Sequence, residues 1–176
     1  MIRFESPADV ETIHALTAAA FQRAPHTSHT EHLIVDALRA REQLTISLVD
    51  EREGVIVGHV AVSPVSVSGV SNGWFGLGPV SVLPGHQGRG VGSGLVRAAL
   101  AQLRAQGAAG CVVLGEPAYY ARFGFRAEPG LVLQGVPPGY FQALAFDAAM
   151  AHGVVAYDAA FDVRPPESEN PEALQG

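Results

Sequence analysis

Five glycines lie within residues 85–94, and this stretch limits what the chain can fold into more than any other feature. A glycine costs roughly 0.5 to 1 kcal/mol relative to alanine in regular structure, so this density requires a structural reason. Before it, the β-branched run of residues 80–83 is typical of a strand. After it, apolar residues recur at helical spacing through residues 95–106, and Gly107 ends that pattern. The order predicts a strand, a glycine-rich loop and a helix that begins near Gly90.

A glycine-rich loop at a helix N-terminus is a candidate site for binding an anion. Successive N–H groups without Cβ atoms can converge on a phosphate, and the helix dipole adds about half a positive charge. A P-loop is excluded, because Val91 stands where a lysine must follow Gly90. The dinucleotide fingerprint Gly-x-Gly-x-x-Gly is excluded because Ser93 stands in place of its third glycine after Gly88 and Gly90. The spacing that fits is Gln-x-x-Gly-x-Gly, over residues 87–92.

This run resembles the coenzyme A signature of the GCN5-related N-acetyltransferase (GNAT) superfamily. A second segment, residues 118–125, resembles the aromatic-Tyr-x-x-x-Gly-Phe segment that follows the fifth strand in that superfamily. The distance from Gln87 to Tyr120 leaves room for one helix, one strand and a short loop, which is the family's order. The resemblance implies an α/β fold, in which a mixed, mostly antiparallel sheet contains a central parallel strand pair and is flanked by helices. As a succession of elements it covers residues 1–163.

The resemblance also implies where acetyl-CoA binds. Its pyrophosphate would lie on the backbone amides of the loop, with Arg89 adding a charge-assisted contact. Its pantetheine arm would enter a gap between the fourth and fifth strands and pair with Val82, while the N–H of Val80 would donate to the oxyanion. Pro79 removes a ladder donor at this place, as a bulge or splay requires. The coenzyme-binding residues expected on this basis are Val82, Gln87, Gly88, Arg89, Gly90, Val91, Gly92 and Ser93.

Two residues are candidates for the proton transfers. Tyr120 lies four residues before Gly124, as the superfamily's catalytic tyrosine does, and a phenol stays protonated at neutral pH to act as general acid; alternatively it only holds a short helix in place. The fourth strand, residues 74–82, carries no carboxylate, although some members of the superfamily have a glutamate there. Glu116, just past the fifth strand, is therefore the first candidate for general base. The alternative is that Glu116 caps the helix that begins at Pro117.

A polar cluster falls where the superfamily's first two helices wall the acceptor pocket. It contains Glu31, a candidate contact to the acceptor, beside His26, His29 and His32. A solvated helix start is the alternative for these residues, and no metal site is expected because no matching distal ligands stand out. Other residues that attract attention are expected to be packing residues (Tyr119, Phe123, Cys111) or to lie at the surface or in hairpins (His59, His86).

The composition excludes some classes of binding partner and some types of reaction. The formal net charge of −6 argues against nucleic acid or an anionic membrane as the main partner. All eleven basic residues are arginine, which excludes Schiff-base and lysine-nucleophile chemistry. One cysteine suits a reducing cytoplasm, and neither a membrane-spanning run nor a signal sequence is recognised. One domain over residues 1–163 and a flexible tail over residues 164–176 are expected.

These observations predict an N-acetyltransferase that moves an acetyl group from acetyl-CoA to a primary amine by direct attack in a ternary complex. The alternative from another class is a non-catalytic acyl-CoA-binding or regulatory module, which the missing carboxylate of the fourth strand would suit. The acceptor is a small-molecule or peptide amine, and the acidic balance favours a cationic one. A homodimer is expected by analogy, since dimers are common among similar proteins.

Overall fold

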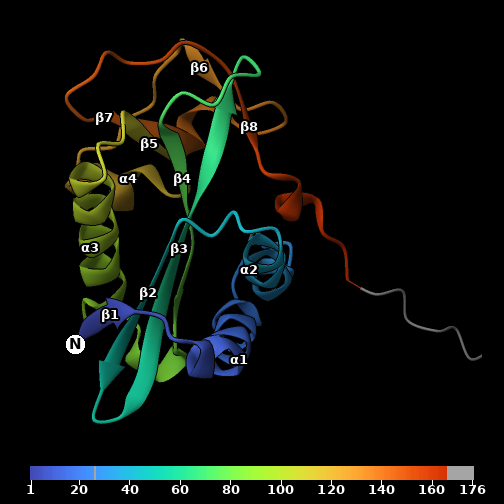
Figure 1. The fold of residues 1–176 in the computed structure, drawn as a ribbon, viewed down its shortest axis with the longest axis vertical. Helices are drawn as coiled ribbons and strands as arrows, with labels where there is room; N and C mark the ends of the chain where they lie inside the picture. Colours follow the sequence, from blue (N-terminus) through green and yellow to red (C-terminus); the bar gives the residue numbers. More distant parts are fainter. Residues whose placement is uncertain (26, 166–176) are drawn as a thin grey trace, which may run out of the picture.

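A computed structural model describes residues 1–25 and 27–165 of the chain. It shows a twisted sheet with helices on both faces, α3 on one and α1 and α2 on the other (Figure 1). His26 and residues 166–176, which include most of the expected tail, lie outside the described residues. None of the helices in the described ranges has the length and apolar character needed to cross a membrane.

The elements are β1 (Ile2–Phe4), α1 (Val10–Phe21), α2 (Glu31–Ala40), β2 (Ile46–Arg52), β3 (Val55–Val67), β4 (Trp74–Val82), α3 (Val91–Ala105), β5 (Gly110–Leu114), α4 (Pro117–Tyr120), β6 (Leu131–Val132), β7 (Phe141–Ala145) and β8 (Gly153–Tyr157), with 3-10 turns at Pro7–Asp9, Pro84–His86, Ala121–Phe123, Pro138–Tyr140 and Ala159–Asp162.

The sheet confirms the predicted fold class. Its main order is β1-β2-β3-β4-β5-β7, and β4 and β5 form the central parallel pair among antiparallel neighbours. At the margin, β8 pairs antiparallel with the C-terminal end of β3, and the short β6 runs parallel to β8. The connection from β4 to β5 passes through α3, as the expected parallel crossover requires.

Helix α3 is positioned by glycines at its ends and beneath it. At its C-terminus, Gly107 adopts φ +76° and its N–H bonds the carbonyl of Arg104, while the N–H of Ala108 bonds that of Leu103, the pair of bonds of a Schellman cap. Under its first turns, a Cβ on Gly58 of β3 would come within 2.8 Å of Val91 and Leu95 side-chain atoms. The missing side chain at residue 58 therefore lets the N-terminal part of α3 settle directly on the sheet.

The hairpin between β2 and β3 has a short turn. Although residues 50–53 are all charged, β2 continues to Arg52, which pairs with Val55. Only Glu53 and Gly54 remain in the turn, with φ +51° and +78°. Two consecutive residues with positive φ match the twist of antiparallel strands, so the ladder continues through charged residues that composition alone assigns to a loop.

His59 is fully buried, which corrects the expectation of a surface position, although it does lie in the hairpin of β2 and β3. It lies in the middle of β3, and its Nε2 shares a hydrogen bond of 2.8 Å with the hydroxyl of Ser47 on β2. Burial, with a smaller contribution from the positive charge of Arg39, lowers the pKa of His59 to about 3. The imidazole is therefore neutral in the folded protein at physiological pH.

Folding stability should consequently fall as pH falls from about 6.5 toward 3. The unfolded chain binds a proton at His59 with an ordinary pKa near 6.5, and the folded chain does not, so acid favours unfolding by roughly 1 kcal/mol per pH unit in this window. Urea unfolding at pH 7, 6, 5 and 4.5 measures the slope, and His59→Gln should remove most of it. An equal slope in the variant would show that other groups cause the acid sensitivity.

Candidate active site

The sheet splits between its two central strands. Residues 74–76 of β4 pair with residues 110–112 of β5, and no pairing between the two strands follows. Each strand keeps its other neighbour, β4 with β3 and β5 with β7, so the two halves of the sheet separate after residue 76 of β4. The register of β4 also shifts by one residue against β3, since Val80 lies opposite Val60 but Leu77 lies opposite Val62. This confirms the bulge or splay expected at Pro79 and leaves the second half of β4 with an open edge.

Val80 and Val82 present their backbone groups to this open edge. The N–H of Leu83 donates to the carbonyl of Val57 on β3 over 2.9 Å. Because N–H and C=O of one residue point the same way and successive residues alternate, Ser81 also faces β3, and Val80 and Val82 face away from it. The side-chain amide of Gln87 already reaches this edge, where it donates to the carbonyl of Val82 over 3.2 Å.

The loop after β4 is open to solvent at the residues expected to hold the coenzyme. Gly88 and Gly90 adopt φ +73° and +80°, and a Cβ on either would meet nothing within 4 Å. These glycines are thus needed for the path of the backbone and not for packing, and they leave free space over the first turn of α3. Arg89 is exposed and forms no ion pair with another described residue. Val91 is buried in the core, so its side chain is not available and only its amide faces the loop.

Tyr119 joins α4 to the N-terminal turn of α3, a role that the sequence did not predict. Its hydroxyl lies 3.3 Å from the Ser93 hydroxyl, and a Cβ on Gly92 would lie 3.3 Å from the same atom. The guanidinium of Arg122 covers the ring at 4.5 Å. The only sequence signal for this contact was Gly92 itself, because a glycine in a helix often marks a close approach.

Tyr120 is held by packing on several sides. Its ring lies against Gly115, where a Cβ would overlap it, and contacts the rings of Phe123 and Phe125 with centroids about 6 Å apart. Burial, with a smaller contribution from Tyr119, raises the pKa of Tyr120 to about 12. Its hydroxyl makes no hydrogen bond with any other residue of the described ranges. The phenol is therefore protonated at neutral pH and uncommitted.

Glu116 occupies the N-cap position of α4 through its backbone. Its carbonyl accepts hydrogen bonds from the N–H groups of Tyr119 and Tyr120, both at 3.1 Å. Its side chain makes no capping hydrogen bond and is exposed. The backbone of Glu116 thus occupies the cap of α4, and the carboxylate projects into solvent beyond the end of β5. The position in the cap therefore leaves the carboxylate available for the role of general base.

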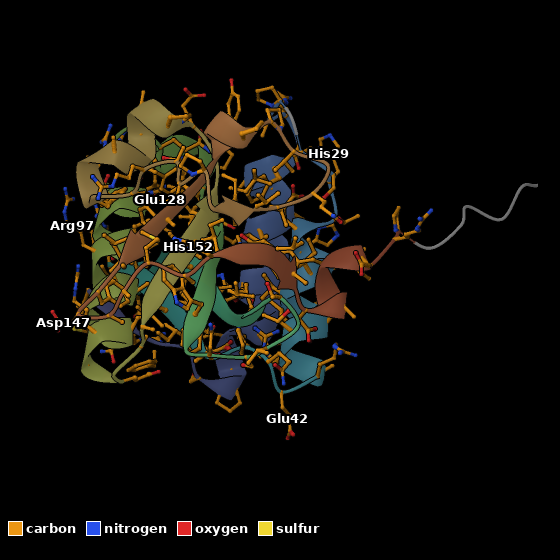
Figure 2. The ribbon with its side chains drawn as sticks, turned by 90° about the horizontal axis from the view of Figure 1, so that it is seen from above. His29, Glu42, Arg97, Glu128, Asp147 and His152 are labelled. Carbon is orange, nitrogen blue, oxygen red and sulfur yellow. The ribbon has the colours of Figure 1, made fainter. Side chains whose placement is uncertain are left out.

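Glu31 belongs to the other face of the sheet, where α1 and α2 lie. It is the first residue of α2 and is only 9% exposed. One carboxylate oxygen accepts a hydrogen bond from the hydroxyl of Thr27, and the other is buried without a partner in the described part of the chain. Its neighbour His29 lies far across the molecule from Arg97 of α3 (Figure 2). Within residues 1–25 and 27–165, no three His, Cys, Asp or Glu side chains are grouped so that they could hold a metal ion.

Comparison with known proteins agrees with this architecture. The acetyltransferase (GNAT) domain family matches residues 1–127. The chain is 40% identical over 126 residues to the uncharacterized N-acetyltransferase YhbS of Escherichia coli K12, covering 71% of this chain and 72% of that protein.

Two solved structures are similar over almost the whole chain. A GNAT family acetyltransferase from Brucella melitensis, determined in complex with acetyl-CoA, is 51% identical with a TM-score of 0.83, covering 92% of this chain and 97% of that one. Escherichia coli YhbS in complex with CoA is 34% identical with a TM-score of 0.83, covering 93% of this chain and 92% of that one.

Proposed function

This chain belongs to the GNAT acetyltransferase family, and we propose that it transfers the acetyl group of acetyl-CoA to a primary amine by direct attack in a ternary complex. The observation that carries the proposal is the junction of two features at one place. The open edge of β4 begins where β5 departs, and it runs directly into the glycine-rich loop that caps α3. A ligand with a phosphate at one end and an extended amide-bearing arm fits that combination.

The coenzyme would occupy both features at once. The pyrophosphate would accept hydrogen bonds from the amides of residues 88–93, and the exposed Arg89 would contact a phosphate. The pantetheine arm would continue along β4 as an additional strand, paired with Val82. The bound acetyl-CoA of the Brucella relative and the CoA of YhbS support this assignment.

The chemistry then follows from the groups around the split. The amine nitrogen attacks the thioester carbon, and the N–H of Val80 stabilises the resulting oxyanion. As the carbon–sulfur bond breaks, Tyr120 donates its proton to the departing thiolate. Glu116, through a water molecule, accepts the proton that the nitrogen loses. The products are the acetylated amine and CoA.

Glu31 is proposed to contact the acceptor. One carboxylate oxygen of Glu31 is buried without a partner among the described residues, which is costly, and a cationic group of the acceptor would supply a partner. The net charge of −6 favours the approach of such acceptors. We also propose that the enzyme works in the cytoplasm, since its single cysteine, Cys111, is free and buried.

Calorimetric titration with acetyl-CoA, followed by thiol-release assays with amines, tests the proposed function. We expect saturable binding and amine-dependent release of CoA from a panel of spermidine, glucosamine and a short peptide with a free amino terminus. Absence of binding by folded protein would overturn the coenzyme assignment. Binding without release for every amine of the panel would instead contradict acetyl transfer to amines of these classes.

A further inference from the structure

Tyr157, on β8, stands at the point where the sheet splits. Strand β8 is placed by its pairing with β3, in which Tyr157 lies opposite Val65. The ring fills the space beside Gly76, where a Cβ would lie 2.5 Å from Tyr157 Cε1. Gly76 is the last residue of β4 that pairs with β5. A glycine at residue 76 is thus required for Tyr157 to lie at the mouth of the gap.

Tyr157 approaches the gap from the face opposite to α3. Along β4, Phe75 and Leu77 pack in the cluster that contains the apolar residues of α3. Trp74 lies on the other side, in the cluster that contains Val65 and Tyr157. Because side chains alternate between the faces of a strand, Gly76 shares the face of Trp74. Tyr120 packs against the α3 cluster. The two tyrosines therefore flank the split from opposite faces.

The hydroxyl of Tyr157 is close to the reaction centre proposed above. Burial raises the pKa of Tyr157 well above its ordinary value, and Cys111 of β5 and Tyr120 add to the rise because they lie nearby. The hydroxyl makes no hydrogen bond with another residue of the described ranges, although its ring is fixed by Gly76 and by Phe161, whose centroid lies 4.8 Å away. It is a rigidly held, neutral hydrogen-bonding group that has no partner among the described residues.

The direction from which the amine must attack brings it past the hydroxyl of Tyr157. The coenzyme would occupy the α3 side of the split and the edge of β4, so the amine must reach the thioester carbon from the face of α1, α2 and β8. We propose that Tyr157 is a further substrate-contacting residue, whose phenol oxygen accepts an N–H of the incoming primary amine and so turns the nitrogen lone pair toward the thioester. This inference rests on the proposed function. No covalent step is added, and Tyr157 keeps its proton throughout.

Steady-state kinetics of Tyr157→Phe test the proposal, with spermidine, glucosamine and the peptide as amine probes. The variant keeps the ring that packs on Gly76 and loses only the hydroxyl. We expect kcat/KM for the amine to fall about tenfold, the size of one substrate hydrogen bond, mainly through KM. The Kd for acetyl-CoA should stay within about twofold, because coenzyme binding does not use this contact. Tyr140→Phe, at an exposed tyrosine, is the matched control.

The outcomes separate the two proposals. Wild-type turnover with unchanged amine kinetics in Tyr157→Phe would overturn the role of Tyr157 while the acetyltransferase function stands. Wild-type protein that binds acetyl-CoA but acetylates none of the probes would contradict acetyl transfer to amines of these classes and, with it, the role of Tyr157. Gly76→Ala provides a second variant, since its Cβ must displace the ring. It should raise KM for the amine at least as much as Tyr157→Phe does, and normal kinetics in folded Gly76→Ala would also contradict the proposal.

Discussion

Replacing Tyr120 by phenylalanine should lower kcat about 100-fold or more while the Kd for acetyl-CoA stays within about twofold. The ring contacts with Gly115, Phe123 and Phe125 remain in the variant, so the change removes only the proton donor. A thiolate that leaves without protonation makes the breakdown of the tetrahedral intermediate harder, which acts on kcat and not on coenzyme binding. Thiol release at saturating acetyl-CoA and calorimetry measure the two quantities.

Tyr119→Phe is the matched control for this substitution. Tyr119 is adjacent in the chain and also a half-buried phenol of α4, but its hydroxyl faces Ser93 instead of being free. Its loss should change kcat by only a few-fold. If Tyr120→Phe retained most of the wild-type kcat, Tyr120 would be a packing residue, and the proton for the thiolate would have to come from another group or from water. Equal losses in both variants would indicate that any damage to α4 is sufficient.

The elements around the glycine-rich loop were predictable because local signals determine them. The strand expected over residues 74–82 and the helix expected to begin near Gly90 agree with β4 and α3, because glycine, proline and β-branched residues mark the ends of elements without reference to distant residues. The open edge at Val80 and Val82 was also anticipated, through Pro79 and the family resemblance. The order of elements along the chain was enough to predict this edge, because β4 and β5 are connected by a single helix, α3.

Contacts between distant segments were not predictable in the same way. His59 is buried because β2 pairs with β3 and supplies Ser47, which no local pattern around residue 59 reveals. Tyr157 lies about eighty residues from Gly76 along the chain and reaches the split only because β8 pairs with the C-terminal end of β3. The sequence contains one sign of this contact, the isolated Gly76 inside a strand. Such a glycine indicates that another group approaches closely, but it does not identify that group.

Gly90→Glu should weaken acetyl-CoA binding more than about 100-fold, to the point where calorimetry detects none. Gly90 caps α3 with φ +80°, and its missing side chain faces open space above the helix N-terminus. A glutamate there would fill that space and bring a negative charge to the place proposed for the pyrophosphate. Repulsion between these like charges adds to the loss of the amide contacts.

Gly69→Glu separates this effect from backbone strain. Gly69 lies in the turn between β3 and β4 and has a similar φ of +78°, and a Cβ there also meets nothing within 4 Å. Both substitutions place an L-residue in the left-handed region, at a cost of about 1 kcal/mol, so thermal unfolding should change similarly in the two variants. Only Gly90→Glu should lose acetyl-CoA binding. If both variants bound the coenzyme like the wild type, the anion would have to lie elsewhere, and the open loop at the start of α3 would need a different ligand.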